Sequence, residues 1–478
     1  MSIIRVQRTI NAMENGNYAE GTGETLESRL TDEGHLAEFV SMLSLRGETR
    51  RISSNVTSMT AVNSSAKATD AIFAAASSEN STACQAVVAS AVAMQNTSLN
   101  ISTLQKVGNN SIAWSLFSKS DHYQTYLPAI VSNLAGISVA AFVDIETIVS
   151  DATAKGAVVD SNLAMSAMVA DTPATQLMVD DHGFMGLVAA RPAAINVVAN
   201  SSQMDVVAGS PVAMTEITAE IGGSAAMANS PGAIQAIANV PTSWQTYKNG
   251  AHFALTLKSA IINIAGLSGS YPTIDSIIAD PVALALVAAN AQASDALSTS
   301  SAAAVTLSTS PNLGIILGSA TAMVYFGTES VITTFLGVEA AVPVVFGSSI
   351  AKGVIVASTP LVDLIAGSSS IVSFLSASAV TSIPASLRSA TTAANDPFDG
   401  IPSKVLTLGM RANNIGAISA NYNFGGSPAA GTGATATIGL KGSVTNTHVF
   451  GYTNPTWTVA GIAVTAAVSP EWTWYDMT

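Results

Sequence analysis

The sequence is poor in cysteine and in charge, and each shortage excludes a class of structure. Its 478 residues include one cysteine, Cys84, so an intrachain disulfide and a cysteine-based zinc site are both excluded. We expect Cys84 to be a small buried apolar residue. Charged residues make up only 10% of the chain, but hydrophobic residues make up 48%, which argues against disorder.

Basic residues are scarce as well. The chain has 18 lysines and arginines against 31 aspartates and glutamates, and its formal net charge is −13. Nucleic acids and anionic membranes are bound by clustered lysine and arginine side chains. We therefore expect no nucleic-acid partner.

Long apolar runs are also missing. A membrane-spanning helix needs about 20 mostly apolar residues. The uncharged stretch 296–328 is interrupted by serine or threonine every few residues and contains Pro311, so we expect no membrane insertion. The N-terminal segment "MSIIRVQRTINAMENGNYAE" lacks a basic stretch followed by an apolar core, so we expect no secretory signal.

A unit of roughly ten residues is what the chain has in abundance. Examples are "RPAAINVVAN" (191–200), "SPVAMTEITA" (210–219) and "SPGAIQAIAN" (230–239). Many units begin with a residue that can cap a helix, often followed by proline at the first helical position. Two apolar residues three positions apart then share one helix face, and asparagine or glycine can end the helix. Each unit therefore predicts one helix of about two turns.

Helices of this length need neighbours. Isolated helices shorter than about 12 residues are marginal in water, so each unit has to pack on the units before and after it. Roughly thirty units in series predict an elongated two-layer α-solenoid.

A longer duplication overlies the short repeat. "SNLAGIS" matches "INIAGLS", "IETIVSD" matches "IDSIIAD", and the Gln-Thr-Tyr of residues 124–126 matches that of residues 245–247. These aromatic-rich segments, near 112–150 and 243–280, lack the ten-residue register. We expect them to form bends or oligomer contacts that interrupt the solenoid.

Charge density and periodicity divide the chain into four parts. Residues 1–52 are predicted to be an N-terminal helical cap or attachment segment, and residues 53–390 the repeat. Residues 391–400 form a linker, and residues 401–478 contain short β-type runs separated by glycine, asparagine and proline. The predicted fold is thus α+β and multidomain: the solenoid is followed by a small C-terminal antiparallel β-sandwich or jelly roll.

No residue set is predicted to be catalytic or to bind a cofactor or a metal ion. The densest group of acids and histidine is "VDDHGF", which contains Asp180, Asp181 and His182. A metal site needs three or four converging ligands, so we expect this segment to be a solvated turn between helices. We expect the protein not to be an enzyme.

Four aromatic residues near the C-terminus are candidates for a ligand or partner surface: Tyr452, Trp457, Trp472 and Trp474. Strand alternation places Trp472 and Trp474 on one face. If that face is exposed, the two indoles form a platform for a sugar or a protein. If it is buried, they form the core of a small sandwich. Both interpretations stay open.

The run "LSLRGETRRISSNVTSMTAVNSS", continuing into "SNLAMSAMVA" and "SPGAIQAIAN", resembles tailed-bacteriophage virion proteins of the tail-fibre or appendage type. Those proteins carry tandem short Ala/Ser-rich helical units after an N-terminal segment. The resemblance covers about residues 40–380. It implies a virion location and an N-terminal attachment end, for which Arg46, Arg50 and Arg51 are the candidate residues.

The expected function is that of a non-enzymatic virion structural protein, a tail-fibre or other appendage subunit that acts as an elongated spacer with a distal β domain. The expected partners are other virion proteins, bound through the N-terminal segment, and further copies of the chain. A homotrimer suits a fibre, and other closed symmetries stay open. The alternative is an adhesin module that binds a host-receptor protein or a cell-surface glycan. A bacterial surface adhesin, which would need an export signal, and a capsule depolymerase are more distant alternatives.

Overall fold

The computed structural model describes residues 3–16, 25–77 and 81–358, scattered positions between 360 and 374, and strand segments between 381 and 476. The predicted linker, residues 391–400, lies outside the described residues. The chain divides into two compact units, Met1–Thr256 and Leu257–Thr478, and each is described by itself.

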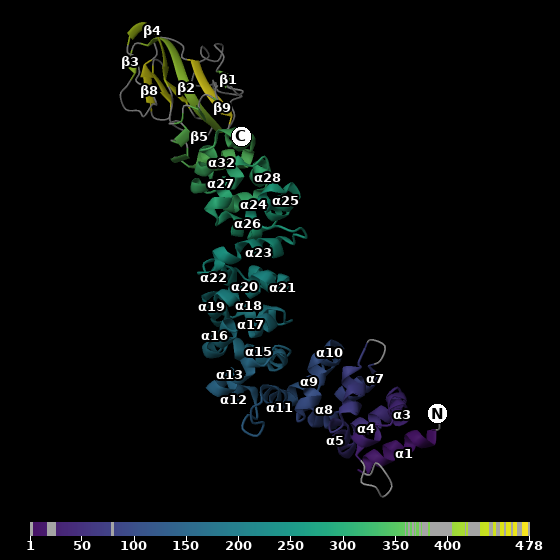
Figure 1. Ribbon diagram of the computed structural model, residues 1–478. Coiled ribbons are helices and arrows are strands. Elements are labelled where there is room, and N and C mark those ends of the chain that lie inside the picture. Colours follow the sequence, from purple (N-terminus) through teal and green to yellow (C-terminus); the bar gives the residue numbers. More distant parts are fainter. Residues whose placement is uncertain are drawn as a thin grey trace. The chain divides into compact units, whose positions relative to one another are not determined.

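Short helices make up the described part of the first unit (Figure 1). They are α1 (Ile3–Glu14), α2 (Leu26–Arg29), α3 (Glu33–Leu43), α4 (Arg46–Ser53), α5 (Val56–Asn63), α6 (Ala66–Thr69), the π-helical turn η1 (Asp70–Ala74), α7 (Thr82–Val88), α8 (Ala91–Ser98), α9 (Ile101–Asn109), α10 (Ser111–Ser118), α11 (Tyr123–Ala135), α12 (Ile145–Ser150), α13 (Ala152–Asp160), α14 (Asn162–Met168), α15 (Thr172–Val179), α16 (His182–Ala190), α17 (Pro192–Ala199), α18 (Met204–Gly209), α19 (Pro211–Ala219), α20 (Ile221–Asn229), α21 (Pro231–Asn239) and α22 (Pro241–Lys248).

Helix α23 (Phe253–Ala265) runs across the division between the units. The helices after it are α24 (Ile274–Ala279), α25 (Pro281–Ala289), α26 (Ala291–Ser298), α27 (Ser301–Thr309), α28 (Leu313–Leu317), α29 (Ala320–Phe326), α30 (Glu329–Leu336), the 3₁₀ turn η2 (Glu339–Ala341), α31 (Val342–Gly347) and α32 (Ser349–Ala357).

Helix starts follow the capping pattern of the sequence. Ser230 has an extended backbone, and its side chain accepts a hydrogen bond from the Ala233 N–H at the start of α21, with Pro231 in the first helical position. The same serine ends α20, so a single extended residue turns the chain between two helices. Asp151 and Ser210 occupy equivalent places. The predicted repeat of short helices is therefore confirmed.

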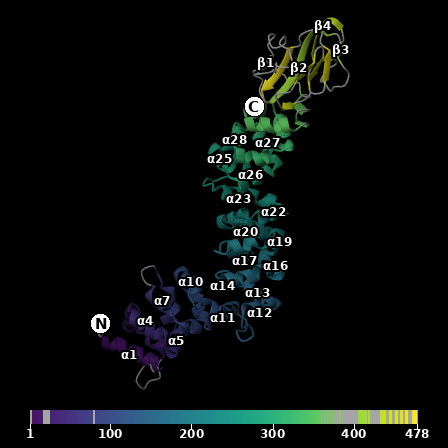
Figure 2. The same cartoon turned by 180° about the vertical axis from the view of Figure 1, so that it is seen from behind.

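Most of the described helices pack on the next helix in sequence and on the third one after it. In the first unit α16, α19 and α22 form one such row, which Figures 1 and 2 show from two sides. In the second unit α25, α28 and α31 form another. The expected two-layer solenoid, in which a helix would lie over the next but one, is wrong. Three corners, each turned by a short extended connection, bring the fourth helix back over the first, so each turn of the coil contains three helices.

The core is formed by fixed positions of each helix. In α19 and α21 the third, fourth, seventh and eighth residues are buried. The third is alanine in both, and its small side chain lets neighbouring backbones approach. The fourth and seventh are the predicted apolar pairs, Met214 with Ile217 and Ile234 with Ile237, and all four side chains are fully buried. The predicted burial of Cys84 is confirmed too, and burial raises the pKa of its thiol to about 12.

Capping side chains also tie successive turns together. Ser210 Oγ accepts from the Ala213 N–H and donates to the Val179 carbonyl, 31 residues upstream, at 2.8 Å. Ser230 donates to the Ala199 carbonyl in the same way. Further links of this kind run from Asn100 to the Asn63 carbonyl, from Ser161 to Leu134, from Asn290 to Ile264, from Asn312 to Ile278, from Ser319 to Ala288 and from Ser348 to Leu317. At these positions the residue that starts a helix therefore also fixes that helix on the previous turn.

The predicted α+β fold with a C-terminal β-sandwich or jelly roll is wrong. Apart from the strand segments given below, the described chain is helical, with 77% helix in 32 helices, and no β-sandwich is seen in it. Alternating β-branched and aromatic residues favour extended strands, but this pattern does not determine whether two sheets pack face to face.

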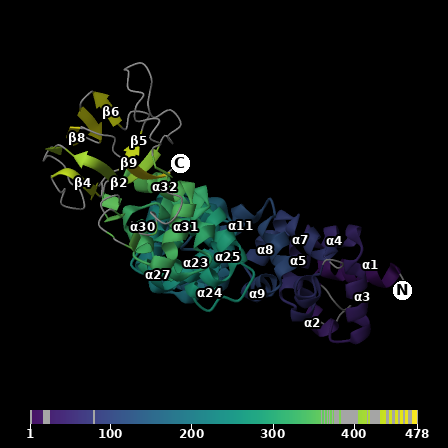
Figure 3. The same cartoon turned by 90° about the horizontal axis from the view of Figure 1, so that it is seen from above.

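The strand segments that follow the helices in sequence pair through their backbones in two sets, and all of the pairs are antiparallel (Figure 3). One set has the order β1-β9-β2-β4 with β5 also on β2, and the other has the order β3-β8-β7-β6. The strands are β1 (Thr381–Ser382), β2 (Lys404–Ile415), β3 (Ala417–Ile418), β4 (Gly431–Ile438), β5 (Ser443–Thr445), β6 (Phe450–Thr453), β7 (Thr456–Val459), β8 (Ile462–Thr465) and β9 (Glu471–Asp476).

Among the described residues, no single helix is both long and apolar enough to cross a bilayer. One pair bent by 107°, Glu329–Leu336 with Glu339–Gly347, meets the requirements of length and composition together.

Candidate functional site

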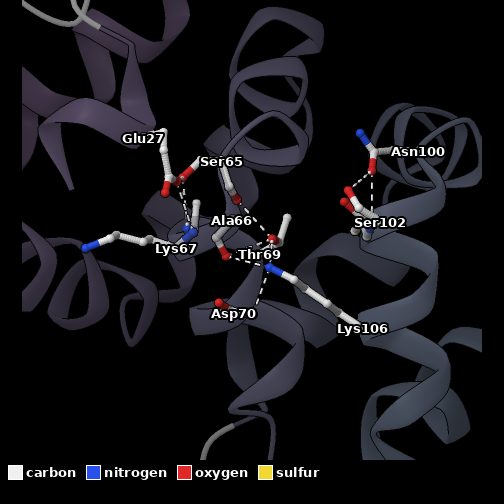
Figure 4. A network of polar contacts seen from close by, with 11 residues as sticks. Glu27, Ser65, Ala66, Lys67, Thr69, Asp70, Asn100, Ser102 and Lys106 are labelled. Carbon is white, nitrogen blue, oxygen red and sulfur yellow. Dashed lines mark hydrogen bonds and ion pairs between the residues drawn. The ribbon is translucent and has the colours of Figure 1, made fainter. Parts of the chain in front are cut away.

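A network of polar contacts joins α2, α6, η1 and α9 near the N-terminus (Figure 4). Glu27 of α2 accepts hydrogen bonds from Ser65 Oγ at 2.6 Å and from the Lys67 N–H at 3.1 Å. Ser65 is the N-cap of α6, so the carboxylate holds the start of that helix. The hydrogen bond from Ser65 is the main reason that the pKa of Glu27 lies below its ordinary value.

Lys106 of α9 closes the other side of this network. Its ammonium donates to the Ala66 carbonyl at 2.7 Å and to Thr69 Oγ1 at 2.8 Å, and it pairs with Asp70 Oδ1 at 2.8 Å. These groups lie where α6 passes into the π-helical turn η1, and π turns occur often at functional sites. The Lys106 side chain is largely buried, so it serves as an internal link between α9 and α6.

The three arginines predicted for attachment lie on α4 and differ in their surroundings. Arg51 donates two hydrogen bonds to the Glu14 carboxylate and one to Asn11 Oδ1 at 3.1 Å, which holds α1 on α4. Glu14 is the main reason that the pKa of Arg51 is raised. Arg46 and Arg50 are exposed. Of the predicted set, these two present their charge to solvent, and Arg51 contributes to the fold.

A pocket of about 410 Å³ lies beside the Glu27 network, between α2 and α5. Glu27 is the charged residue of its lining, and Val56 at its edge is 59% exposed. The residues that line it are Thr25, Leu26, Glu27, Val56, Thr57, Thr60, Ala61 and Ser64. A mostly apolar pocket beside one carboxylate can receive a side chain of a partner protein.

The acid–histidine segment forms a turn between helices, as predicted. Asp180 ends α15 and Asp181 caps α16. Asp181 Oδ1 accepts from Lys155 Nζ of α13 at 2.7 Å, and His182 Nδ1 lies 2.9 Å from Glu216 Oε1 of α19. Burial alone would raise the pKa of Asp181, but the hydrogen bonds from Lys155 and from the backbone outweigh it, and the pKa is lowered. The segment therefore links the row α13, α16 and α19.

In the part of the chain that the structure describes, no three or more histidine, cysteine, aspartate or glutamate side chains gather where they could hold a metal ion. The four C-terminal aromatic residues are placed by backbone register. Tyr452 and Trp457 are direct partners in the β6–β7 pair, and Trp472 and Trp474 lie on β9 opposite Met410 and Thr407 of β2. Their side chains lie outside the described residues.

Two aromatic clusters have the same geometry. We call Trp114, Phe117 and Tyr123 the first aromatic joint, and Trp244, Tyr247 and Phe253 the second. In each, the first two rings stack at 6.2–6.3 Å, and the third ring stands edge-on to both at 5.7–6.3 Å. Helix α11, which starts at Tyr123, contacts α8 and α9 on one side and α13 and α14 on the other. The clusters therefore hold consecutive parts of the coil together.

Sequence reasoning found the duplication but aligned part of it incorrectly. The expected match of residues 124–126 with 245–247 is wrong, because the first segment lies in α11 and the second in α22. Tyr247 is equivalent to Phe117 in the stacked pair. The offset from Trp114 to Trp244 is the same as that from His122 to His252, and this constant offset was the signal in the sequence that could have given the alignment.

The chain was compared with protein-family models and with curated proteins, and neither comparison gave a match.

Proposed function

We propose that this protein is a non-enzymatic structural subunit of a bacteriophage particle, a tail-fibre or other appendage component that acts as a spacer. The observation that carries the proposal is the link from several serine and asparagine caps to the previous turn of helices, as in Ser210 to Val179 and Ser319 to Ala288. A coil linked in this way grows by repetition, and a spacer needs a length that repetition can set. The virion location rests on the resemblance of residues 40–380 to virion proteins.

The ion pairs between helices of the coil support a structural function. Lys155 pairs with Asp181, and Arg191 pairs with Asp160, in each case between different turns. These ion pairs hold the coil in register and do not converge on a common point. Exposed Arg46 and Arg50 on α4 are then the groups through which the N-terminal segment contacts an acidic surface on a neighbouring virion protein.

The test is to find the chain in particles. Purified virions are analysed by mass spectrometry and by electron microscopy with an antibody to residues 81–358. The proposal predicts the chain in every particle preparation and label on a tail appendage. Absence of the chain from washed infectious particles would contradict it.

The attachment role is tested by complementation of a phage that lacks the gene. Arg46→Glu with Arg50→Glu is expected to reduce the amount of chain per particle while the purified protein keeps its unfolding midpoint. Arg51→Ala is the matched variant on the same helix, and it should lower stability because it breaks the contact with Glu14. Normal incorporation of the double variant would exclude these arginines as the attachment groups.

Binding of a host receptor or glycan is the second candidate, and the direct pairing of Tyr452 with Trp457 across two strands favours it. Adjacent aromatic residues can stack on a sugar ring. The full chain and its Trp457→Ala and Trp472→Ala variants would be applied to a glycan array and to host cells. Binding that both variants lose at unchanged helix content supports this function, and equal signals from all three proteins count against it.

A further inference from the structure

The two aromatic joints begin two copies of one arrangement. The helix that each joint starts has 13 residues, against eight or nine for most helices of the coil. Each ends at a left-handed glycine, Gly136 with φ +71° and Gly266 with φ +65°. The next N–H then donates to the carbonyl five residues back, Ile137 to Ser132 and Leu267 to Ile262, both at 2.9 Å.

The links to the following turn are equivalent as well. Near the end of α11 the Leu134 carbonyl accepts from Ser161, which caps α14. Near the end of α23 the Ile264 carbonyl accepts from Asn290, which caps α26. In both copies the acceptor lies on the long helix, and the donor caps the third helix after it.

One difference between the joints shows which feature the two copies share. Tyr123 is the third ring of the first joint, and its hydroxyl donates to the Ala167 carbonyl at 3.0 Å. In the second joint the hydroxyl is on the second ring, and Tyr247 donates to the Ser224 carbonyl at 3.0 Å. The hydroxyl group is therefore on a different ring in each joint and donates to a different carbonyl. The arrangement of the three rings is nearly the same in both joints. Ring packing is therefore the constant feature of the joint.

We infer that residues 123–252 are an exchangeable module, and that the length of this protein is set in steps of one such module. The module contains helices α11 to α22, which are twelve helices and hence four turns of three. Its removal joins His122 to Phe253, where the chain already has the pair His252–Phe253. Phe253 then follows Trp114 and Phe117 at the spacing that Tyr123 has now. The inference rests on the fold alone and stands whether or not the protein belongs to a virion.

The test is an in-register deletion of residues 123–252 in the otherwise complete chain. Its matched control deletes residues 123–240, which removes the eleven helices α11–α21 and leaves α22, so the row of every later helix changes. Unfolding is followed by far-UV circular dichroism. We expect the in-register deletion to unfold cooperatively within about 5 °C of the full chain, and the control to lose at least about 10 °C or its cooperativity.

A second pair of variants lengthens the chain, so that the inference can still be tested if any shortening of the chain impairs its folding. One inserts an extra copy of residues 123–252 after His252, and the other inserts residues 123–240 at the same place. The in-register insertion should keep the midpoint of the full chain, and the out-of-register insertion should not. The inference is overturned if neither in-register variant is more stable than its control.

Discussion

The residue on which this fold depends is the helix cap that both accepts and donates. A serine hydroxyl or an asparagine amide can accept from the N–H groups of its own helix and donate to a carbonyl of the previous turn. An aspartate carboxylate only accepts, so an aspartate cap starts a helix without making that link. At Asp181 the ammonium of Lys155 contacts the carboxylate from another turn instead. The choice between serine, asparagine and aspartate at a cap therefore decides how two turns are joined.

Two serines of the second unit allow the capping of a helix to be distinguished from the link to the previous turn. Ser319 accepts from the Ala322 N–H and donates to the Ala288 carbonyl, whereas Ser300 accepts from the Ala303 N–H and has no acceptor in another turn among the described residues. Ser300→Ala should cost about 1 kcal/mol through loss of the cap. Ser319→Ala should cost about 2 kcal/mol, because the Ala288 carbonyl also loses its donor. Hydrogen exchange of peptides from α25 to α29 measures both, and equal costs would show that the second bond contributes nothing.

Asp181 makes the stability of the first unit depend on pH. The pKa of this carboxyl is lowered in the folded protein, so its contribution is present above its ordinary pKa of about 4 and is lost as the pH falls further. Asp181→Asn should therefore narrow the difference between the unfolding midpoints at pH 6 and pH 3. We expect an effect of about 1 kcal/mol or less, the size of a partly exposed ion pair. An identical pH dependence in the variant would argue against this role.

At the scale of the element, the sequence determines where a helix starts, stops and buries its side chains. Ser230, Pro231 and the pair Ile234 and Ile237 are enough to specify α21. The same pattern cannot say which helix covers which, because a spacing of three within a helix defines a buried face but not its partner. That is why the sequence predicts two layers where the fold has three helices per turn. The pocket beside Glu27 was missed for the same reason, since α2 and α5 meet only in the folded chain.

Two glycines of the first unit should respond in opposite ways to alanine. Gly136 ends α11 with φ +71°, where a Cβ costs roughly 1–2 kcal/mol. Gly156 lies in the middle of α13 with open space where a Cβ would lie, so alanine there should stabilise by about 0.5–1 kcal/mol. Chemical denaturation of the two single variants gives both signs. A stabilising Gly136→Ala would contradict the left-handed end of α11.

At the scale of the whole molecule, the main contacts of the described helices are with helices of their own turn and of the turns next to it. Such a chain has no single centre whose loss unfolds everything, and its stability is close to a sum over neighbouring turns. The sequence predicted the repeat of short helices. It predicted the C-terminal fold class wrongly, because alternating residues such as those of "EWTWYD" favour a strand without specifying how sheets pack.

Deletion of one turn from the first unit tests the central claim, three helices per turn, most directly. Deletion of residues 181–209 removes α16, α17 and α18, so that α19, with its own cap Ser210, takes the place of α16 next to α13 in the row that they already share. Deletion of residues 181–190 removes α16 alone and moves every later helix into the wrong row. The account predicts cooperative unfolding near the original midpoint for the three-helix deletion and a clear loss for the one-helix deletion. A one-helix deletion as stable as the three-helix deletion would contradict it.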